Sequence, residues 1–186
     1  MRGLRRYLAT EPAPVLERCE LCATDIPAEH PHLVHVADRR LVCACGPCAF
    51  LFDAPGAGGY ARVPDRVRRA DGLDDATWEA LQIPVGAAFV LRNSVQDRLI
   101  ACYPSPAGAT ESELPVPAGL PLLAELAPDV EALLVRRDPP ESYLVPVDEC
   151  YRLVGLVRRH WTGFDGGPAA HAAIDGFFAE LEARAC

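Results

Sequence analysis

The stretch from Cys19 to Cys48, CELCATDIPAEHPHLVHVADRRLVCACGPC, decides the fold of the amino-terminal third of the chain. It holds five of the eight cysteines. One Cys-x-x-Cys pair, Cys19 and Cys22, opens the stretch, and a second pair, Cys45 and Cys48, closes it. Each pair can grip an ion from a tight turn, and two pairs together supply the four thiolates of a tetrahedral metal site. We therefore predict that these four cysteines bind one metal ion.

Zinc is the metal that this pattern favours. Four thiolates suit zinc and iron sites alike, so the spacing by itself leaves both open. Rubredoxin-like iron sites usually carry glycine after the second cysteine of each pair, whereas Ala23 and Ala49 stand there in this chain. Zn2+ is therefore expected, and iron is less favoured. A structural zinc ion contributes about 10–16 kcal/mol of apparent binding free energy to a small module, so a purely fold-stabilising role is sufficient.

Cys43 is a fifth thiol beside this four-ligand set, and three interpretations stay open. Its side chain could point away from the metal, it could replace Cys45 as a ligand, or it could form a second site with His30, His32 and His35. Imidazole and thiolate ligands suit zinc or nickel. His32 and His35 are three residues apart, so on one strand they point to opposite faces, which weakens the cluster. Such histidines are more often surface residues or hydrogen-bond partners of the first site's ligands.

The local pattern around the cysteines predicts a small zinc module. Short strands are expected over His32–Val36 and Arg40–Cys43, joined by a turn. The second cysteine pair then opens an apolar segment, Ala49–Phe52, which could form one or two turns of helix. The positive end of a helix dipole favours thiolates at that place. A cysteine knuckle, a hairpin and a helix, in this order, resemble a treble-clef zinc finger.

The segment 53–59, with three glycines and one proline, divides the chain near residue 60. We expect a cysteine-rich zinc-binding module over residues 1–60 and an α+β domain over residues 61–186. Two hairpins are predicted in this domain, the first from segments 85–91 and 98–103 and the second from 130–135 and 142–147. Helices are predicted after the N-cap Asp74, over 120–126, from Asp148 to Trp161 and from Pro168 onward, and 104–117 is expected to be a loop. The predicted architecture is an antiparallel sheet with helices packed on one face.

The charge distribution bears on the partners of the protein. The chain has a net charge of −8, to which residues 1–70 contribute +2 and residues 71–186 contribute −10. Affinity for phosphates comes mainly from Lys and Arg, so this acidic balance argues against binding to nucleic acid. No stretch reaches the roughly 18 consecutive apolar residues of a membrane span. No apolar core of signal-peptide length follows Arg2, Arg5 and Arg6, so we expect a cytoplasmic protein whose clustered thiols hold metal rather than form disulfides.

The residues outside the cysteine cluster give no catalytic assignment. The chain has no Gly-x-Ser-x-Gly elbow and no P-loop lysine, and no catalytic triad or carboxylate dyad emerges. Cys102 and Cys150 fall on a predicted strand and on the core-facing side of a predicted helix, where a free thiol behaves as a small buried hydrophobic group. We therefore do not expect an enzyme, although a catalytic site built on the α+β part stays open.

Several motifs together carry a family resemblance that covers the chain from about residue 15 to its carboxyl end. They are Cys19-Glu-Leu-Cys22, Cys43-Ala-Cys-Gly-Pro-Cys48, Tyr103-Pro-Ser-Pro-Ala-Gly108, Pro128-Asp-Val-Glu-Ala-Leu-Leu134 and Val147-Asp-Glu-Cys-Tyr-Arg-Leu-Val-Gly155. The combination resembles an uncharacterised bacterial family encoded beside the genes of NiFe hydrogenases. This resemblance implies an accessory role in hydrogenase assembly, maturation or regulation, with a hydrogenase subunit or maturation factor as the partner. It transfers no catalytic residue.

The favoured hypothesis is thus a cytoplasmic, zinc-binding accessory protein that binds another protein. The first alternative is a metal or redox carrier that uses Cys43 and the nearby histidines to pass on an ion. The second alternative is a zinc finger that binds nucleic acid, which the net charge of −8 disfavours.

Overall fold

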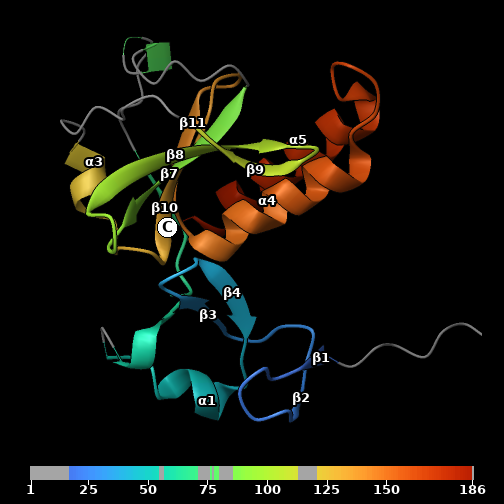
Figure 1. Ribbon diagram of the computed structural model, residues 1–186. Helices are drawn as coiled ribbons and strands as arrows, with labels where there is room; N and C mark the ends of the chain where they lie inside the picture. The colour runs from blue at the N-terminus through green and yellow to red at the C-terminus, as the bar shows by residue number, and fades with distance from the viewer. Residues whose placement is uncertain are drawn as a thin grey trace, which may run out of the picture.

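The computed structural model describes residues 17–54, 57–70, 76, 78–79, 86–112 and 121–185 (Figure 1). The first part of the chain forms two small antiparallel sheets, β1 with β2 and β4-β3-β5, and the short helix α1. The elements are β1 (Glu17–Arg18), β2 (Asp25–Ile26), β3 (His32–His35), β4 (Arg40–Cys43), α1 (Gly46–Phe50), the 3-10 turn η2 (Ala57–Gly59) and β5 (Tyr60–Arg62).

The predicted hairpin of the first part is confirmed, and its register places His32 opposite Cys43. A third strand, β5, pairs with the other edge of β3 and sets Tyr60 opposite His35. The β1–β2 turn is closed by the N–H of Ala23, which donates to the carbonyl of Cys19 at 2.7 Å. Ala23 adopts a left-handed backbone with φ of 61°, which bends the chain tightly enough for both cysteines of the first pair to face one side.

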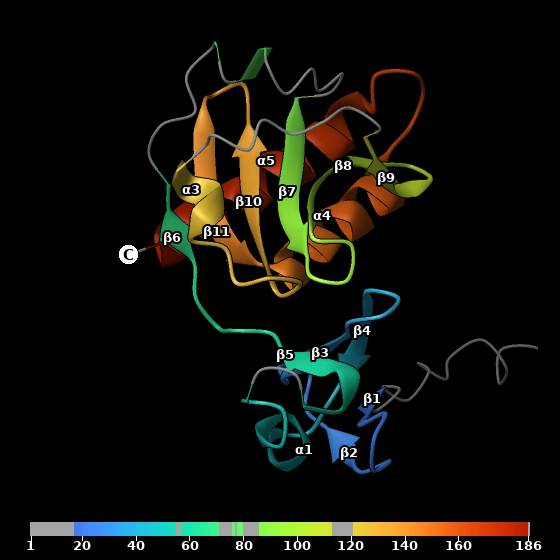
Figure 2. The ribbon, with the colours of Figure 1, turned by 60° about the vertical axis from the view of Figure 1, so that its left-hand side comes forward.

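The second part forms an antiparallel sheet of strand order β6-β11-β10-β7-β8-β9 (Figure 2). Both predicted hairpins, β7 with β8 and β10 with β11, are present, and β10 joins them by pairing with β7. The elements are β6 (Arg68–Arg69), β7 (Ala87–Asn93), β8 (Arg98–Ser105), β9 (Gly108–Glu111), α3 (Pro121–Ala124), β10 (Glu131–Arg136), β11 (Glu141–Pro146), α4 (Val147–His160) and α5 (Gly167–Arg184).

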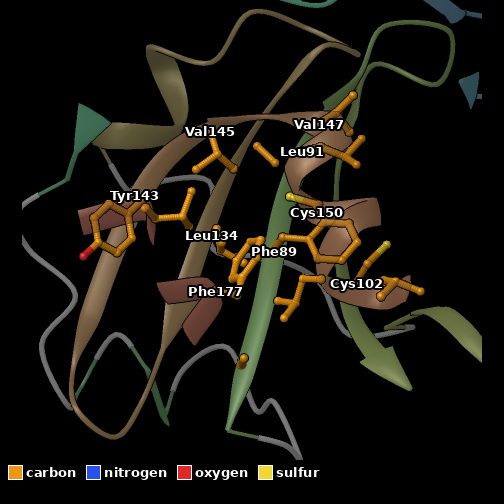
Figure 3. Close-up of a cluster of buried hydrophobic side chains, with 14 of the residues drawn as sticks. Phe89, Leu91, Cys102, Leu134, Tyr143, Val145, Val147, Cys150 and Phe177 are labelled. Carbon is orange, nitrogen blue, oxygen red and sulfur yellow. The ribbon is translucent and has the colours of Figure 1, made fainter. Parts of the chain in front are cut away.

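The long helices α4 and α5 pack together on one face of this sheet, and α3 lies on the other (Figure 2). Alternate residues of β10 face the two layers because successive side chains of a strand point to opposite faces. Ala132 and Leu134 belong to the core under α4 and α5, where Phe89, Tyr143 and Phe177 gather (Figure 3). Leu133 and Val135 join Trp78, Leu123 and Leu126 on the face of α3. The predicted α+β class is therefore confirmed.

Two local predictions need correction. The segment expected to be a loop contains regular structure, because Pro104 and Ser105 continue β8 and residues 108–111 form β9. The Ser105 hydroxyl donates to the carbonyl of Gly108, and Gly108 has φ of 129°, so a two-residue turn suffices there. Helix α4 begins at Val147, so Asp148 lies in the first turn instead of capping the helix. The helix expected after Asp74 and the region 113–120 lie largely outside the described residues.

The two parts of the chain meet along β3, β5 and the segment that leads to β6. Val34, Val63 and Val67 are buried in the same core cluster as Leu91, Val130 and Val147. The Arg39 guanidinium reaches the Glu111 carboxylate at 3.2 Å across this boundary. Arg66 donates two hydrogen bonds, of 2.6 and 2.9 Å, to the buried carboxylate of Glu131 on β10. The connecting segment is thus held against the sheet by both apolar and ionic contacts.

We expect Phe177→Ala to lower the free energy of unfolding by about 3–5 kcal/mol, because it removes a ring at the centre of the core. The Phe177 ring is 1% exposed and packs edge-on against Phe178 with centroids 5.5 Å apart. Phe164, which is fully exposed, provides the matched control. Phe164→Ala should change the same quantity by no more than about 0.5 kcal/mol. Urea unfolding at fixed Zn2+ concentration measures both, and equal effects of the two substitutions would contradict this packing.

We expect Glu131→Gln to lower stability near neutral pH by about 1.5–3 kcal/mol, because charged hydrogen bonds to the buried carboxylate are lost. Burial raises the pKa of Glu131, but the Arg66 guanidinium and the Ala127 N–H outweigh burial and hold the pKa below its usual value. A lowered carboxyl pKa stabilises the fold above the unfolded-state pKa of about 4.3, and this contribution is lost as pH falls through the folded-state pKa.

The stability difference between the wild type and Glu131→Gln should therefore shrink on acidification below pH of about 4. Glu125→Gln is the control, because the Glu125 carboxylate is half exposed where it meets Arg68. That substitution should cost at most about 1 kcal/mol. Denaturant midpoints measured across the pH range test this, and a difference that grows with acid would contradict the assigned pairing.

Candidate metal centre

Four cysteine sulfurs meet where the turn between β1 and β2 adjoins the start of α1. Figure 1 shows these elements together at the bottom of the view, away from the six-stranded sheet. The Sγ atoms of Cys19, Cys22, Cys45 and Cys48 all lie within 4.8 Å of one another. The Sγ atoms of Cys22 and Cys45 are 3.7 Å apart. The first two cysteines come from the turn between β1 and β2, and the last two flank the start of α1. These four thiols could hold a metal ion.

The backbone around each pair explains why the sulfurs converge. Cys45 has an extended backbone and stands just before α1, and its carbonyl accepts the first helical hydrogen bond from Ala49 at 2.9 Å. Pro47 fits the first turn of a helix, where its missing N–H costs nothing. One turn of helix separates Cys45 from Cys48, so both thiols face the knuckle formed by β1 and β2.

Little apolar surface supports this part of the chain. The small core beneath the thiols consists of Cys19, Ile26, Leu33, Val42, Ala44 and Ala49, with half-buried side chains around it. Three of these six are alanine or cysteine, which bury little area on folding. A module of this size usually needs a metal or disulfides for stability, and the cysteines among the described residues are free thiols.

The thiols differ in how readily they give up a proton. Burial raises the pKa of Cys19, but hydrogen bonds from the backbone N–H groups of Cys45, Cys22 and Leu21 outweigh it and lower the pKa to about 6. Contact with the Cys45 thiol, and then with Cys22, raises the pKa of Cys48 to about 12. The backbone around Cys19 therefore favours the thiolate of that residue. A divalent cation would supply the charge that stabilises a thiolate at Cys48 as well.

Glu20 connects the turn between β1 and β2 to strand β4 by hydrogen bonds. Its carboxylate accepts hydrogen bonds from the Cys43 N–H at 2.9 Å and from Arg40 at 2.6 Å. Its own N–H donates to the carbonyl of Cys43 at 2.9 Å. The Cys43 N–H, followed by Arg40, holds the pKa of the Glu20 carboxyl below its usual value. The strand residue Cys43 is thus fixed relative to the first cysteine pair.

The four-thiol group contains Cys45 and not Cys43, so Cys43 does not take the place of Cys45. A second group consists of His30, His32 and Cys43, whose ligand atoms also lie within 4.8 Å of one another. His35 is separate from both groups. Its Nδ1 lies 2.7 Å from the Asp38 carboxylate, and its ring packs against Tyr60. The alternation of side chains along β3 explains this separation, because His32 and His35 face opposite sides.

Two features of this region were not predicted from the sequence. The Asp148 carboxylate lies 2.9 Å from Nδ1 of His32, although 116 residues separate them. No local pattern indicates that contact, because Asp148 carries the signal of a helix start. Beside the four thiols, Leu21, Phe50 and Leu51 are 39%, 69% and 68% exposed. The apolar residues after Cys48 were expected to form a helix, and they do so only in part, leaving two large side chains in solvent.

The described helices include none that is both long enough and apolar enough to cross a membrane. No curated protein and no solved structure matches the chain. The model of a family of unknown function, DUF5947, matches residues 18–185 and so includes both cysteine pairs, the histidine cluster and the whole of the six-stranded sheet. The chain therefore belongs to the DUF5947 family.

Proposed function

We propose that the protein is a zinc-stabilised accessory protein whose amino-terminal module, residues 1–60, binds another protein. The convergence of four cysteine sulfurs within 4.8 Å of one another is the observation that carries this proposal. Four thiolates fill a tetrahedral coordination sphere and leave no open position, which is typical of structural and not of catalytic zinc. The α+β domain, residues 61–186, supplies the core on which the module rests.

The arrangement of the module supports zinc in a treble-clef-like setting. The knuckle of β1 and β2, the hairpin of β3 and β4 and the helix α1 follow one another in that order. Ala23 and Ala49 follow the two cysteine pairs and favour zinc over iron. A zinc ion bound there ties the two pairs into one unit, because its bonds join the β1–β2 turn to the start of α1.

The exposed apolar residues beside the thiols provide the surface for a partner. Leu21 lies between the cysteines of the first pair, and Phe50 and Leu51 follow the second pair directly. The ion would therefore hold both apolar segments in fixed positions. Large exposed apolar side chains that gather at one place mark protein interaction sites. The occupant we propose is an apolar segment of another protein.

The resemblance to proteins encoded beside hydrogenase genes supports the choice of partner. We propose a NiFe hydrogenase subunit or a hydrogenase maturation factor in the cytoplasm. The charge of −8 disfavours nucleic acid as the partner. No catalytic step is assigned to the protein.

We expect Cys22→Ser to remove one equivalent of bound Zn2+ relative to the wild type, because a tetrahedral thiolate site loses one of its four bonds. The amino-terminal module should then become sensitive to proteolysis, since the zinc contribution of about 10–16 kcal/mol to its folding is largely lost. Elemental analysis and limited proteolysis measure the two effects.

Cys102→Ala is the matched control, because Cys102 is a buried thiol of β8 outside the cluster. It should keep the full zinc content. Undiminished zinc in Cys22→Ser, or iron–sulfur absorption in the visible spectrum of the wild type, would refute the zinc assignment.

We expect Phe50→Asp and Leu51→Asp to reduce recovery of a hydrogenase subunit or maturation factor by about tenfold or more, which corresponds to at least about 1.4 kcal/mol of binding free energy. A carboxylate placed in an apolar contact loses its hydration without gaining a partner. Phe164→Asp is the control, because it changes an even more exposed ring on the segment between α4 and α5.

The measurement is affinity purification of the tagged full chain from its own host, with the partner identified by mass spectrometry. Wild type and Phe164→Asp should recover the same hydrogenase component. Repeated purifications that recover no such component, or equal recovery by Phe50→Asp, would overturn the proposed partner or the proposed surface respectively.

A further inference from the structure

A second cluster of metal-binding side chains lies beside the four-thiol centre and shares no ligand with it. The register of β3 and β4 sets His32 directly opposite Cys43, so both side chains share one face of the hairpin. His30 precedes β3 by one proline residue and turns back toward them, and its ring meets that of His32 edge-on with centroids 4.8 Å apart. One ligand atom of each residue lies within 4.8 Å of those of the other two.

The hydrogen bond of His30 shows which ring nitrogen is available. Nδ1 of His30 lies 2.9 Å from the carbonyl oxygen of Pro27. A carbonyl can only accept, so Nδ1 carries the proton and Nε2 is left with a lone pair. That Nε2 is buried and has no hydrogen-bond partner within the described part of the chain. An unpaired buried acceptor is costly, and a bound cation would satisfy it.

His32 is oriented in the same way by a different partner. Its Nδ1 lies 2.9 Å from Oδ2 of Asp148, on α4. The other carboxylate oxygen of Asp148 accepts a hydrogen bond from the N–H of Glu149 at 2.9 Å, which fixes the carboxylate. When the ring is neutral, a carboxylate that accepts a hydrogen bond from Nδ1–H leaves Nε2 with the lone pair. Histidines that ligate metals almost always donate their second N–H to a carboxylate or a backbone carbonyl, and here each histidine has one of the two.

We propose that His30, His32 and Cys43 form a second metal site, which binds a borderline divalent ion such as Zn2+ through two imidazole nitrogens and one thiolate. This donor set suits such ions. Nitrogen and sulfur ligands of tetrahedral zinc are about 3.3–3.7 Å apart, given bonds of about 2.0–2.3 Å, so side-chain shifts of about 1 Å complete the site. One thiolate and the Asp148 carboxylate balance the charge of the ion.

The second site differs from the four-thiol centre in having an open position. Three protein ligands leave the fourth tetrahedral position for water or an incoming ligand. His30 and His32 line a groove between the hairpin and α4, along with Asp148 and Arg152. An ion held there is open to solvent on the groove side and exchanges faster than an ion enclosed by four thiolates. This second site is separate from the proposed function, and its metal binding does not depend on the identity of the partner.

Zinc binding by the reduced, metal-free full chain tests the proposal, with calorimetry and elemental analysis as readouts. The wild type should bind two equivalents, the second of which a chelator removes first. His30→Ala and Cys43→Ala should bind one. His35→Ala is the matched control and should bind two, because His35 lies on the same strand but contacts Asp38 instead.

Asp148→Asn tests the positioning role of the carboxylate without removing a ligand. We expect it to weaken binding of the second equivalent by about 10–100-fold and to leave the first unchanged. Retention of the first equivalent in each variant also shows that the amino-terminal module is folded. If His30→Ala loses both equivalents, the test of the second site is Asp148→Asn. Weaker binding of the second equivalent alone supports the site, and unchanged binding of both equivalents contradicts it.

A wild type that binds one equivalent, or a second equivalent that persists in both His30→Ala and Cys43→Ala, overturns the second site. Either result leaves the four-thiol centre standing, because Cys22→Ser tests that centre separately. Loss of the only bound equivalent in Cys22→Ser, with unchanged binding in Cys43→Ala, would confirm one site and exclude the other.

Discussion

The amino-terminal module depends on bringing four sulfurs of two distant turns together. The apolar core beneath them is small, and the strands β1 and β2 have two residues each. Such elements bury too little surface to offset the conformational entropy of ordering the chain. The neighbouring thiols raise the pKa of Cys48, so a full set of thiolates is favoured only with a cation between them. An ion bound by all four would close the β1–β2 turn against α1.

Strand β3 contributes side chains to two cores, one in the amino-terminal module and one in the rest of the molecule. Leu33 faces the small core beneath the thiols, and Val34 faces the large core under α4 and α5. Both are almost fully buried, so the strand is covered on its two faces. A shift of the amino-terminal module would disturb both cores at once. The division near residue 60 therefore remains a prediction about sequence organisation, while packing joins the two parts through one shared strand.

The sequence is most informative where an interaction is local. The Cys-x-x-Cys spacing predicts a metal-binding turn because both ligands belong to the same few residues. Alternating or continuous apolar runs predict the hairpins for a similar reason. Whether Cys43 or Cys45 joins the four-thiol group depends on the path of the chain after β4, and the spacing of the cysteines does not define that path. Strand β9 was missed because Pro104 and Gly108 indicate a loop, although both tolerate the tight turn and edge position that they occupy here.

Long-range contacts account for the other features that the sequence left open. His32 and Asp148 are neighbours only because α4 lies against the open face of the β3–β4 hairpin. Neither residue has a pattern that points to the other. Likewise, the apolar run 49–52 does not indicate which of its side chains are covered, and Phe50 and Leu51, at the end of the short helix α1, are exposed. Exposed apolar side chains beside a rigid turn are costly for solubility, which favours a function for them in binding.

The position of Asp148 also connects the two metal-binding groups to the fold as a whole. A metal held by His32 would be one hydrogen bond from α4, the helix that covers the main sheet. An ion bound at the second group would tighten the contact between the amino-terminal module and α4, since it would polarise the imidazole and strengthen its bond to the carboxylate. The four thiols join two segments of the amino-terminal module, whereas the histidine group joins that module to α4 through Asp148. The two groups therefore differ in position as well as in donor chemistry.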